Sequence, residues 1–281
     1  MSSRMDSILS DGRVAVITGA AAGLGAALAT RLAQKGMKLA LFDRDEEKLQ
    51  ALAHTLPIET LTRCGDASSM EDLEAFHTAT IDRFGAIHLL INNVGMMKPA
   101  GPWDSPAEWR QGLDVNFTSA LAMQHLFVPA MIAANAPAAI VNLGSKEGIT
   151  TPPGNACYSV AKAAIKVLTE QLEHEVRSTT GGRVSAHLFV PGYTWTPMNA
   201  AQKPAGSDKP TGAWTSEQTV DYFLARLHKE DFYILCPDGE VTPDMDARRM
   251  RWAVEDLIFN RPALSRWHPN FKEAFEKWMK A

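Results

Sequence analysis

The feature that most constrains the fold of this chain is an alternation of short apolar runs with longer helical patterns, which begins at Arg13. The runs are continuously apolar, as is typical of strands in a parallel sheet that helices cover on both faces. They predict strands at residues 14–18, 37–43, 59–64, 88–92, 138–143, 183–190 and 232–236. Helices are predicted at residues 26–35, 45–56, 69–84, 106–135 and 155–179. The predicted fold class is therefore α/β, with a doubly wound parallel sheet.

The chain changes in character after this core of residues 13–190. Residues 191–214 are rich in Pro, Gly, Ser and Lys, and a polar segment of this length in a compact domain predicts a lid over a site or a disordered connection. Residues 237–281 predict a helical C-terminal extension, with two helices around residues 261–269, that packs over the lid or a neighbouring subunit. No internal repeat or second boundary is visible, so residues 1–281 are predicted to form a single domain.

The composition excludes several classes of protein. A formal net charge of −4 does not favour a partner such as nucleic acid or an anionic membrane. Three widely spaced cysteines, Cys64, Cys157 and Cys236, form no Cys-x-x-Cys pattern, so neither a metal site nor a disulfide framework is expected. Residues 1–12 lack the apolar run of a signal peptide, and no apolar stretch approaches a membrane span. A cytoplasmic location is therefore expected.

A glycine-rich turn follows the first predicted strand. Gly19 permits a tight turn, Gly23 lets the backbone approach a pyrophosphate, and Gly25 permits close contact between helix and strand. The helix that follows would offer free N–H groups and its dipole to phosphate. The spacing is G-x-x-x-G-x-G rather than the commoner G-x-G-x-x-G, and an ordinary strand–helix turn is the alternative.

An acidic residue ends the second predicted strand. Asp43 stands 18 residues after Gly25, close to the offset of an acid that binds the adenosine ribose of a dinucleotide. A carboxylate accepts hydrogen bonds from the ribose hydroxyls and repels a 2′-phosphate, so Asp43 favours NAD over NADP. Two alternatives remain: Asp43 could cap the next helix, and the adjacent Arg44 could meet a phosphate.

A tyrosine and a lysine four residues apart, Tyr158 and Lys162, lie on one face of a predicted helix. A lysine cation one turn away is expected to lower the pKa of the phenol and make it a usable acid or base. A Tyr-x-x-x-Lys pair alone is common by chance. The pair becomes a specific indication of a site because of the residues that accompany it. Ser145 follows the fifth predicted strand and Pro191 follows the sixth, at the edge where such sheets bind ligands.

Together these segments resemble the motif set of the short-chain dehydrogenase/reductase family. The matching segments run in order from Arg13 to Met198: TGAAAGLG, NNVG, Asn116, Ser145, YSVAK and PGYTWT. The resemblance implies a Rossmann fold of the short, single-domain branch, and an oxidoreductase that transfers a hydride between nicotinamide and a secondary alcohol or ketone. Val94 and Gly144 depart from the family's usual Ala and Ser, but neither change removes a reacting group.

The resemblance also implies roles for four catalytic residues. Tyr158 would donate or accept the proton of the alcohol, and Ser145 would hydrogen-bond the substrate oxygen. Lys162 would lower the pKa of the tyrosine and hold the nicotinamide ribose, and Asn116 would anchor a water that relays protons to Lys162.

The remaining implied positions fall into two groups. The first group would bind the cofactor: Gly19, Gly23, Leu24, Asp43, Asp66, Ala67, Asn93, Gly95, Tyr158, Lys162, Pro191, Gly192, Thr194 and Thr196. The second group would lie near the substrate: Met96, Lys146, Glu147, Asn155, Tyr193 and Met198. Asp66 could instead cap the helix at Ser69, and Lys146 and Glu147 could form a solvated pair at the rim.

Two alternatives to an NAD-dependent dehydrogenase stay open. A non-catalytic NAD-binding sensor protein would keep the glycine turn and Asp43 but would not need Ser145, Tyr158 and Lys162. An NADP-preferring ketoreductase would use the same catalytic residues. In either enzymatic case the expected partners are a small alcohol or ketone substrate and further copies of the chain, as a homodimer or homotetramer.

Overall fold

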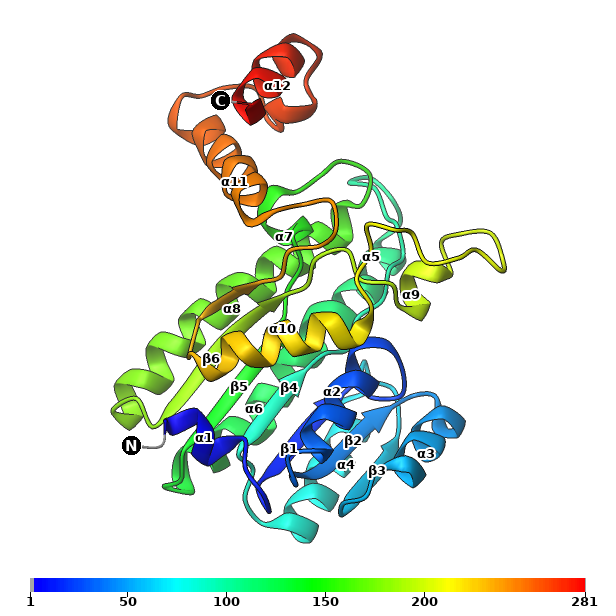
Figure 1. The fold of residues 1–281 in the computed structure, drawn as a ribbon, viewed down its shortest axis with the longest axis vertical. Coiled ribbons are helices and arrows are strands. Elements are labelled where there is room, and N and C mark those ends of the chain that lie inside the picture. The colour runs from blue at the N-terminus through cyan, green and yellow to red at the C-terminus, as the bar shows by residue number, and fades with distance from the viewer. Residues whose placement is uncertain (1–2, 281) are drawn as a thin grey trace.

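A computed structural model describes residues 3–280, and a seven-stranded parallel sheet runs through its centre (Figure 1). The strands are β1 (Val14–Thr18), β2 (Lys38–Asp43), β3 (Thr60–Cys64), β4 (Leu89–Asn92), β5 (Ala138–Leu143), β6 (Val184–Val190) and β7 (Tyr233–Leu235). Their order is β3-β2-β1-β4-β5-β6-β7. This confirms the predicted doubly wound sheet, because the order reverses between β1 and β4.

Helices cover both faces of the sheet (Figure 1). One face carries α1 (Arg4–Ile8), α2 (Gly23–Ala33), α3 (Glu46–Thr55) and α10 (Ser216–His228). The other carries α4 (Met70–Phe84), α6 (Ser119–Ala133) and α8 (Ala156–Thr180), with α5 (Pro106–Leu113) leading into α6. Strand residues alternate between the two cores, for example Ile17 to the first and Val16 to the second. Burial on both faces explains why the strands are continuously apolar.

The first helix after the sheet's leading strand begins earlier than predicted. α2 starts at Gly23, not at residue 26, so Gly23 and Gly25 form its first turn. Four further helices were not predicted: α1, α10, the short α7 (Glu147–Thr150) and α9 (Pro197–Ala200) inside the lid segment. α10 packs on α2, where Arg31 Nε lies 2.7 Å from a carboxylate oxygen of Asp221.

The helix predicted at residues 106–135 is interrupted by a π-helical turn at Asp114–Thr118. The stretch Pro106–Ala133 is long and apolar enough to cross a membrane, so the expectation that no segment reaches that length was wrong. The apolar side chains of this stretch include Met123, Phe127 and Met131, which are buried in the core between α6 and the sheet. The same composition therefore serves a core helix here.

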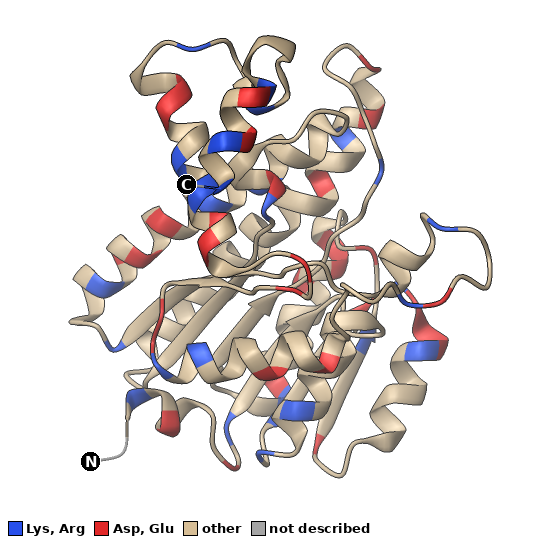
Figure 2. Ribbon diagram, turned by 45° about the horizontal axis from the view of Figure 1, so that its top comes forward, with Lys and Arg blue, Asp and Glu red and all other residues tan. Residues whose placement is uncertain are grey.

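The C-terminal segment forms a small helical unit that projects from the sheet (Figure 1). It consists of α11 (Pro243–Ile258) and α12 (Lys272–Lys280), joined by short 3₁₀ turns at Ser265–Trp267 and Pro269–Phe271. Trp252 is its buried centre, and its indole N–H donates to Ser265 Oγ at 2.8 Å. Both basic and acidic residues lie along these helices (Figure 2). The unit contacts α7, so the tail packs beside the site.

Candidate functional site

A cavity of about 510 Å³ lies beyond the carboxyl ends of the strands. Nearly all of the residues predicted for cofactor and substrate line this one cavity: Gly19, Gly23, Leu24, Asp43, Asp66, Ala67, Asn93, Gly95, Met96, Ser145, Lys146, Glu147, Tyr158, Lys162, Pro191, Gly192, Tyr193, Thr194, Thr196 and Met198. They come from the ends of strands β1 to β5 or the segments after them, from α2, from α8 and from the lid, at the edge of the sheet where such folds bind ligands.

The glycine turn shapes the end of the cavity next to β1. Gly19 and Gly23 have φ of 65° and 55°, values that favour glycine. A Cβ on Gly25 would lie 1.9 Å from Gly19 O, so helix and turn touch through backbone alone. Ala22, the N-cap of α2, supplies no side-chain hydrogen bond, which leaves the first-turn N–H groups open to an anion. The turn therefore fits a dinucleotide pyrophosphate.

Asp43 connects this turn to the next loop. Its carboxylate accepts a hydrogen bond from Ala21 N–H at 2.9 Å and another from Asp45 N–H at 3.0 Å. The cap of α3 is Asp45, which accepts from Lys48 N–H at 3.1 Å, so Asp43 is not the helix cap. A carboxylate accepts about four hydrogen bonds, and the remaining two sites can receive a ribose diol.

The loop after β3 supplies the neighbouring wall. Asp66 Oδ1 accepts from Ser68 N–H and from Ser68 Oγ–H, both at 2.8 Å, and these bonds lower the pKa of Asp66. The N-cap of α4 is Ser69, so the alternative that Asp66 caps this helix is wrong. Ala67 is buried beside it and leaves room in the cavity.

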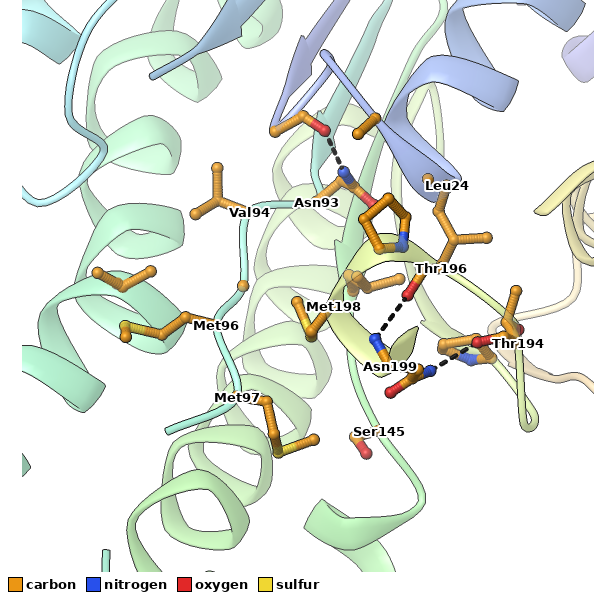
Figure 3. Close-up of a pocket in the computed structure, with 18 of the residues that line it drawn as sticks. Leu24, Asn93, Val94, Met96, Met97, Ser145, Thr194, Thr196, Met198 and Asn199 are labelled. Carbon is orange, nitrogen blue, oxygen red and sulfur yellow. Dashed lines mark hydrogen bonds between the residues drawn. The ribbon is translucent and has the colours of Figure 1, made fainter. Parts of the chain in front are cut away.

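The segment after β4 forms the floor of the cavity (Figure 3). Asn93 Nδ2 donates to Thr18 O at 3.1 Å and to Gly19 O at 2.9 Å, which fixes the glycine turn to this segment. A Cβ on Gly95 would lie 3.3 Å from Asn116 Oδ1 and 3.8 Å from Lys162 Nζ. The backbone at Gly95 therefore passes close to the side chains of Asn116 and Lys162, with little room for a larger residue at this position.

Ser145, Tyr158 and Lys162 meet at the middle of the cavity. The hydroxyl of Ser145 lies close enough to the side chain of Tyr158 to lower the pKa of its phenol. Lys162 lies one turn along α8, with Nζ 5.7 Å from the centre of the Tyr158 ring. Its ammonium donates to Leu143 O at 2.8 Å, and two N–H groups remain for other acceptors. Tyr158 thus has Ser145 and Lys162 as neighbours within the same cavity.

The acidities of these groups differ from the expectation. Burial raises the pKa of Tyr158 to about 12; within this net shift the hydroxyl of Ser145 lowers the pKa and the charge of Glu147 raises it. Burial lowers the pKa of Lys162 to about 8. Lys162 is not among the groups that shift the pKa of Tyr158, so the expected lowering of the phenol pKa by Lys162 does not appear in the chain alone. In the chain alone, Ser145 is the group that favours the phenolate.

Asn116 lies behind the cavity wall rather than in it. It belongs to the π-helical turn and is buried, and its Oδ1 accepts from Met96 N–H at 2.9 Å. Its Nδ2 donates to Met96 O at 3.1 Å and to Gly112 O at 2.9 Å. Both amide protons are used within the chain, so the side chain holds the floor segment to α5.

The lid segment folds over the glycine turn. Thr194 pairs with Trp214 in a parallel bridge, which closes the two ends of the segment on each other. Thr194 Oγ1 is buried against Thr219 Oγ1, while its carbonyl accepts from Asn199 Nδ2 (Figure 3). Thr196 caps α9, and its Cβ lies 3.3 Å from where a Cβ on Gly23 would be. Residues 201–209 beyond α9 are exposed.

The predicted solvated pair of Lys146 and Glu147 does not exist. Lys146 Nζ lies 2.6 Å from a carboxylate oxygen of Asp246 on α11 and 3.6 Å from one of Asp238. Asp238 also accepts from Tyr193 N–H at 3.0 Å. Glu147 is half-buried, and burial raises its pKa. The two neighbours diverge because the C-terminal unit supplies acids that the local sequence does not show.

Asn155 was wrongly predicted near the substrate. Its side chain is turned toward Met97, with Nδ2 3.0 Å from Sδ, and it does not line the cavity. Met97, Asn199 and Asp238 do line it and were missed. Asp238 follows the last strand by three residues, so the position of ligands at strand ends could have revealed it.

Comparisons with known proteins agree with this geometry. The pattern of the short chain dehydrogenase family matches residues 13–206. An uncharacterised oxidoreductase of Staphylococcus aureus is 31% identical over 204 residues, which cover 72% of this chain and 86% of that protein.

Two solved structures are similar over most of the chain. One is a short chain dehydrogenase/reductase from Burkholderia phymatum in complex with NAD, with 30% identity, a TM-score of 0.79, and coverage of 89% of this chain and 96% of that chain. The other is a metagenomic short-chain oxidoreductase in complex with NADP, with 27% identity, a TM-score of 0.67, and coverage of 81% and 98%. With the seven-stranded sheet and the residues gathered at its edge, these matches show that the chain belongs to the short-chain dehydrogenase/reductase family of oxidoreductases.

Proposed function

We propose that this protein transfers a hydride between NAD and a secondary alcohol or ketone. One observation carries the proposal: Ser145, Tyr158 and Lys162 line the same cavity as the glycine turn and Asp43. A site that only binds a dinucleotide has no need of a tyrosine and a serine that line the cavity together beyond the binding turn.

The chain's own residues would hold the dinucleotide along the cavity. The first-turn N–H groups of α2 suit the pyrophosphate, and Asp43 suits the adenosine ribose. Asn93 and Gly95 provide the floor, and Thr194 and Thr196 lie on the lid side. When bound, the nicotinamide accepts or supplies the hydride.

Proton transfer would be carried out by Tyr158. During oxidation its phenolate would take the proton of the alcohol, and during reduction its hydroxyl would return it. Ser145 would hydrogen-bond the same oxygen and stabilise its developing charge. The two N–H groups of Lys162 that are not bonded to Leu143 O would hold the ribose and stabilise the phenolate.

We infer a preference for NAD because Asp43 offers negative charge where NADP carries a phosphate. Arg44 also lines the cavity and supports the alternative of an NADP-preferring ketoreductase. Asp43 is the better placed of the two, since the backbone N–H groups of Ala21 and Asp45 hold its carboxylate.

We also infer that the chain forms a homodimer or homotetramer. Leu121 on α6 and Val160 and Val167 on α8 are apolar side chains 42%, 49% and 54% exposed, on two helices that lie against each other. Light scattering of the purified protein tests this. A cytoplasmic location stays a prediction from the sequence.

The main proposal is tested by mixing the protein with NAD and a panel of secondary alcohols while following NADH absorbance. Tyr158→Phe is expected to lower kcat by about 10²–10⁴-fold, the usual contribution of a positioned acid or base. Its affinity for NADH, measured by fluorescence, should stay nearly unchanged. Tyr222→Phe on α10, which does not line the cavity, is the matched control.

The outcome separates the candidate functions. Tight binding of NADH without turnover of any alcohol or ketone would favour the sensor protein. Full activity of Tyr158→Phe would contradict the role assigned to Tyr158.

A further inference from the structure

The carboxylate of Glu147 differs from every other acid that lines the cavity. Asp43 and Asp66 accept hydrogen bonds from loop residues, and Asp238 accepts three and lies near Lys146. Within residues 3–280, no hydrogen bond or ion pair satisfies the carboxylate of Glu147. The half-buried carboxylate is thus left to water in the open cavity, and a ligand that displaces this water would have to supply a donor in its place.

Glu147 lines the cavity together with Ser145 and Tyr158. Its backbone N–H donates to Ser145 Oγ at 3.1 Å, and its charge acts on Tyr158. The nearest cation in sequence, Lys146, is held by Asp246 and Asp238 and does not neutralise it. Glu147 therefore belongs to the same part of the cavity wall as the two residues that would hold the substrate oxygen.

The remaining wall at this end of the cavity is mostly apolar. Met96 and Met97 from the segment after β4 and Met198 from α9 line it (Figure 3). Thioether side chains offer no strong hydrogen-bond donor to a carboxylate. These three side chains therefore leave the carboxylate of Glu147 to water or to a donor on the ligand.

We propose that Glu147 binds a second hydrogen-bond donor of the substrate, a hydroxyl or an ammonium group on a carbon close to the reacting one. This inference rests on the proposed alcohol or ketone oxidoreductase and names its substrate class: diols, hydroxyketones or amino alcohols. An ammonium group would also offset the charge by which Glu147 raises the pKa of Tyr158, so binding of such a substrate would favour the phenolate.

The test compares three derivatives of isopropanol that carry a hydroxyl, an ammonium or a methoxy group on the neighbouring carbon. The readout is kcat/KM with NAD for each donor-bearing alcohol, divided by that for the methoxy compound, which lacks a donor. Glu147→Leu is expected to lower both ratios about ten- to a hundredfold, the range for a hydrogen bond to a charged group. Glu147→Gln should keep much of the ratio for the hydroxyl compound, because an amide oxygen still accepts a hydrogen bond. The same variant should lose most of the ratio for the ammonium compound, because the negative charge is gone, and this difference distinguishes a hydroxyl donor from an ammonium donor.

A binding measurement makes the result independent of turnover. Dissociation constants of the three compounds for the protein–NADH complex, from ligand-observed NMR titration, should change in the same directions. Glu175→Gln, an exposed acid on α8 outside the cavity, is the control and should leave all ratios unchanged. If ratios and dissociation constants are the same in wild type and both Glu147 variants, the inference is overturned. If wild type turns over none of a wider alcohol panel, the proposed function fails, and the binding measurement still decides the role of Glu147.

Discussion

Lys146 Nζ lies 2.6 Å from a carboxylate oxygen of Asp246, and this ion pair joins the residue after Ser145 to the first turn of α11. The two side chains are only 23% and 11% exposed, so water screens the pair weakly. A helix more than 90 residues further along the chain therefore helps to hold the strand end that carries Ser145.

Removing the acid from this pair is expected to affect both stability and catalysis. Asp246→Asn leaves Lys146 with the more distant Asp238 alone and should lower the free energy of unfolding by about 1–3 kcal/mol. It should also lower kcat/KM, because α7 and Ser145 lose a support. Urea denaturation and steady-state kinetics measure the two effects. Asp244→Asn is the control: its carboxylate is 73% exposed, so a loss within about 0.5 kcal/mol is expected. Equal losses in the two variants would contradict the coupling.

Asp43→Asn is expected to shift cofactor preference toward NADP. The amide keeps the size of the side chain but removes the charge that would repel a 2′-phosphate. The ratio of kcat/KM with NADP to that with NAD should rise about tenfold, equivalent to about 1.4 kcal/mol of discrimination. Asp45→Asn at the N-cap of α3 should leave this ratio unchanged. An unchanged ratio in Asp43→Asn would mean that Asp43 serves only the N–H groups of Ala21 and Asp45.

Gly23→Ala is expected to weaken NADH binding because it adds a methyl group to the glycine turn. The new Cβ would lie 3.3 Å from Thr196 Cβ, and φ of 55° strains any residue with a side chain. The expected loss is about tenfold or more in affinity by fluorescence titration. Gly85→Ala is matched for backbone strain, with φ of 74° and nothing within 4 Å of its Cβ, and lies outside the cavity. If both variants bind NADH as wild type does, the turn does not approach the pyrophosphate.

Lys162 is expected to make the stability of the protein depend on pH. Its pKa falls from 10.5 to about 8 on folding, so the folded state binds this proton less tightly than the unfolded state. Below pH 8 both states carry the charge and the full cost of burying it is present; the cost disappears as pH rises to 10.5. Stability relative to Lys162→Met should therefore rise by about 3 kcal/mol over that interval. Urea denaturation of both proteins across the interval checks this, and a difference independent of pH would contradict it.

Much of the site could be predicted because strand ends are local features. A continuous apolar run marks each strand, and the residue after it lies at the binding edge whatever the helices do. Asp43, Ser145 and Pro191 were placed in this way, and all three line the cavity. The same reasoning applied to the last strand would have added Asp238.

Side-chain direction could not be predicted from the same patterns. Asn155 stands three residues before Tyr158, yet packing of the loop after β4 turns it to Met97. The sequence suggests a solvated pair of Lys146 and Glu147, but Asp246 of the C-terminal unit binds Lys146 instead. The π-helical turn at Asp114–Thr118 could not be predicted either, because the spacing of apolar residues does not distinguish it from an α-helical turn. The bonds of Asn116 to Met96, 20 residues earlier in the chain, depend on the folded structure.

The packing of α10 on α2 has a consequence for how the protein is made. α2 follows the glycine turn near the start of the chain and carries Arg31. Its ion-pair partner Asp221 lies on α10, which is synthesised almost 200 residues later. Until then Leu28 and Leu32 of α2, which are fully buried in the finished protein, have no complete cover. Contacts between such distant segments form late, because a long loop must close first. A nascent chain that stalls before Ser216 would therefore expose the apolar face of α2 to chaperones and proteases. A messenger RNA truncated at this point should yield aggregated protein rather than a smaller dinucleotide-binding protein.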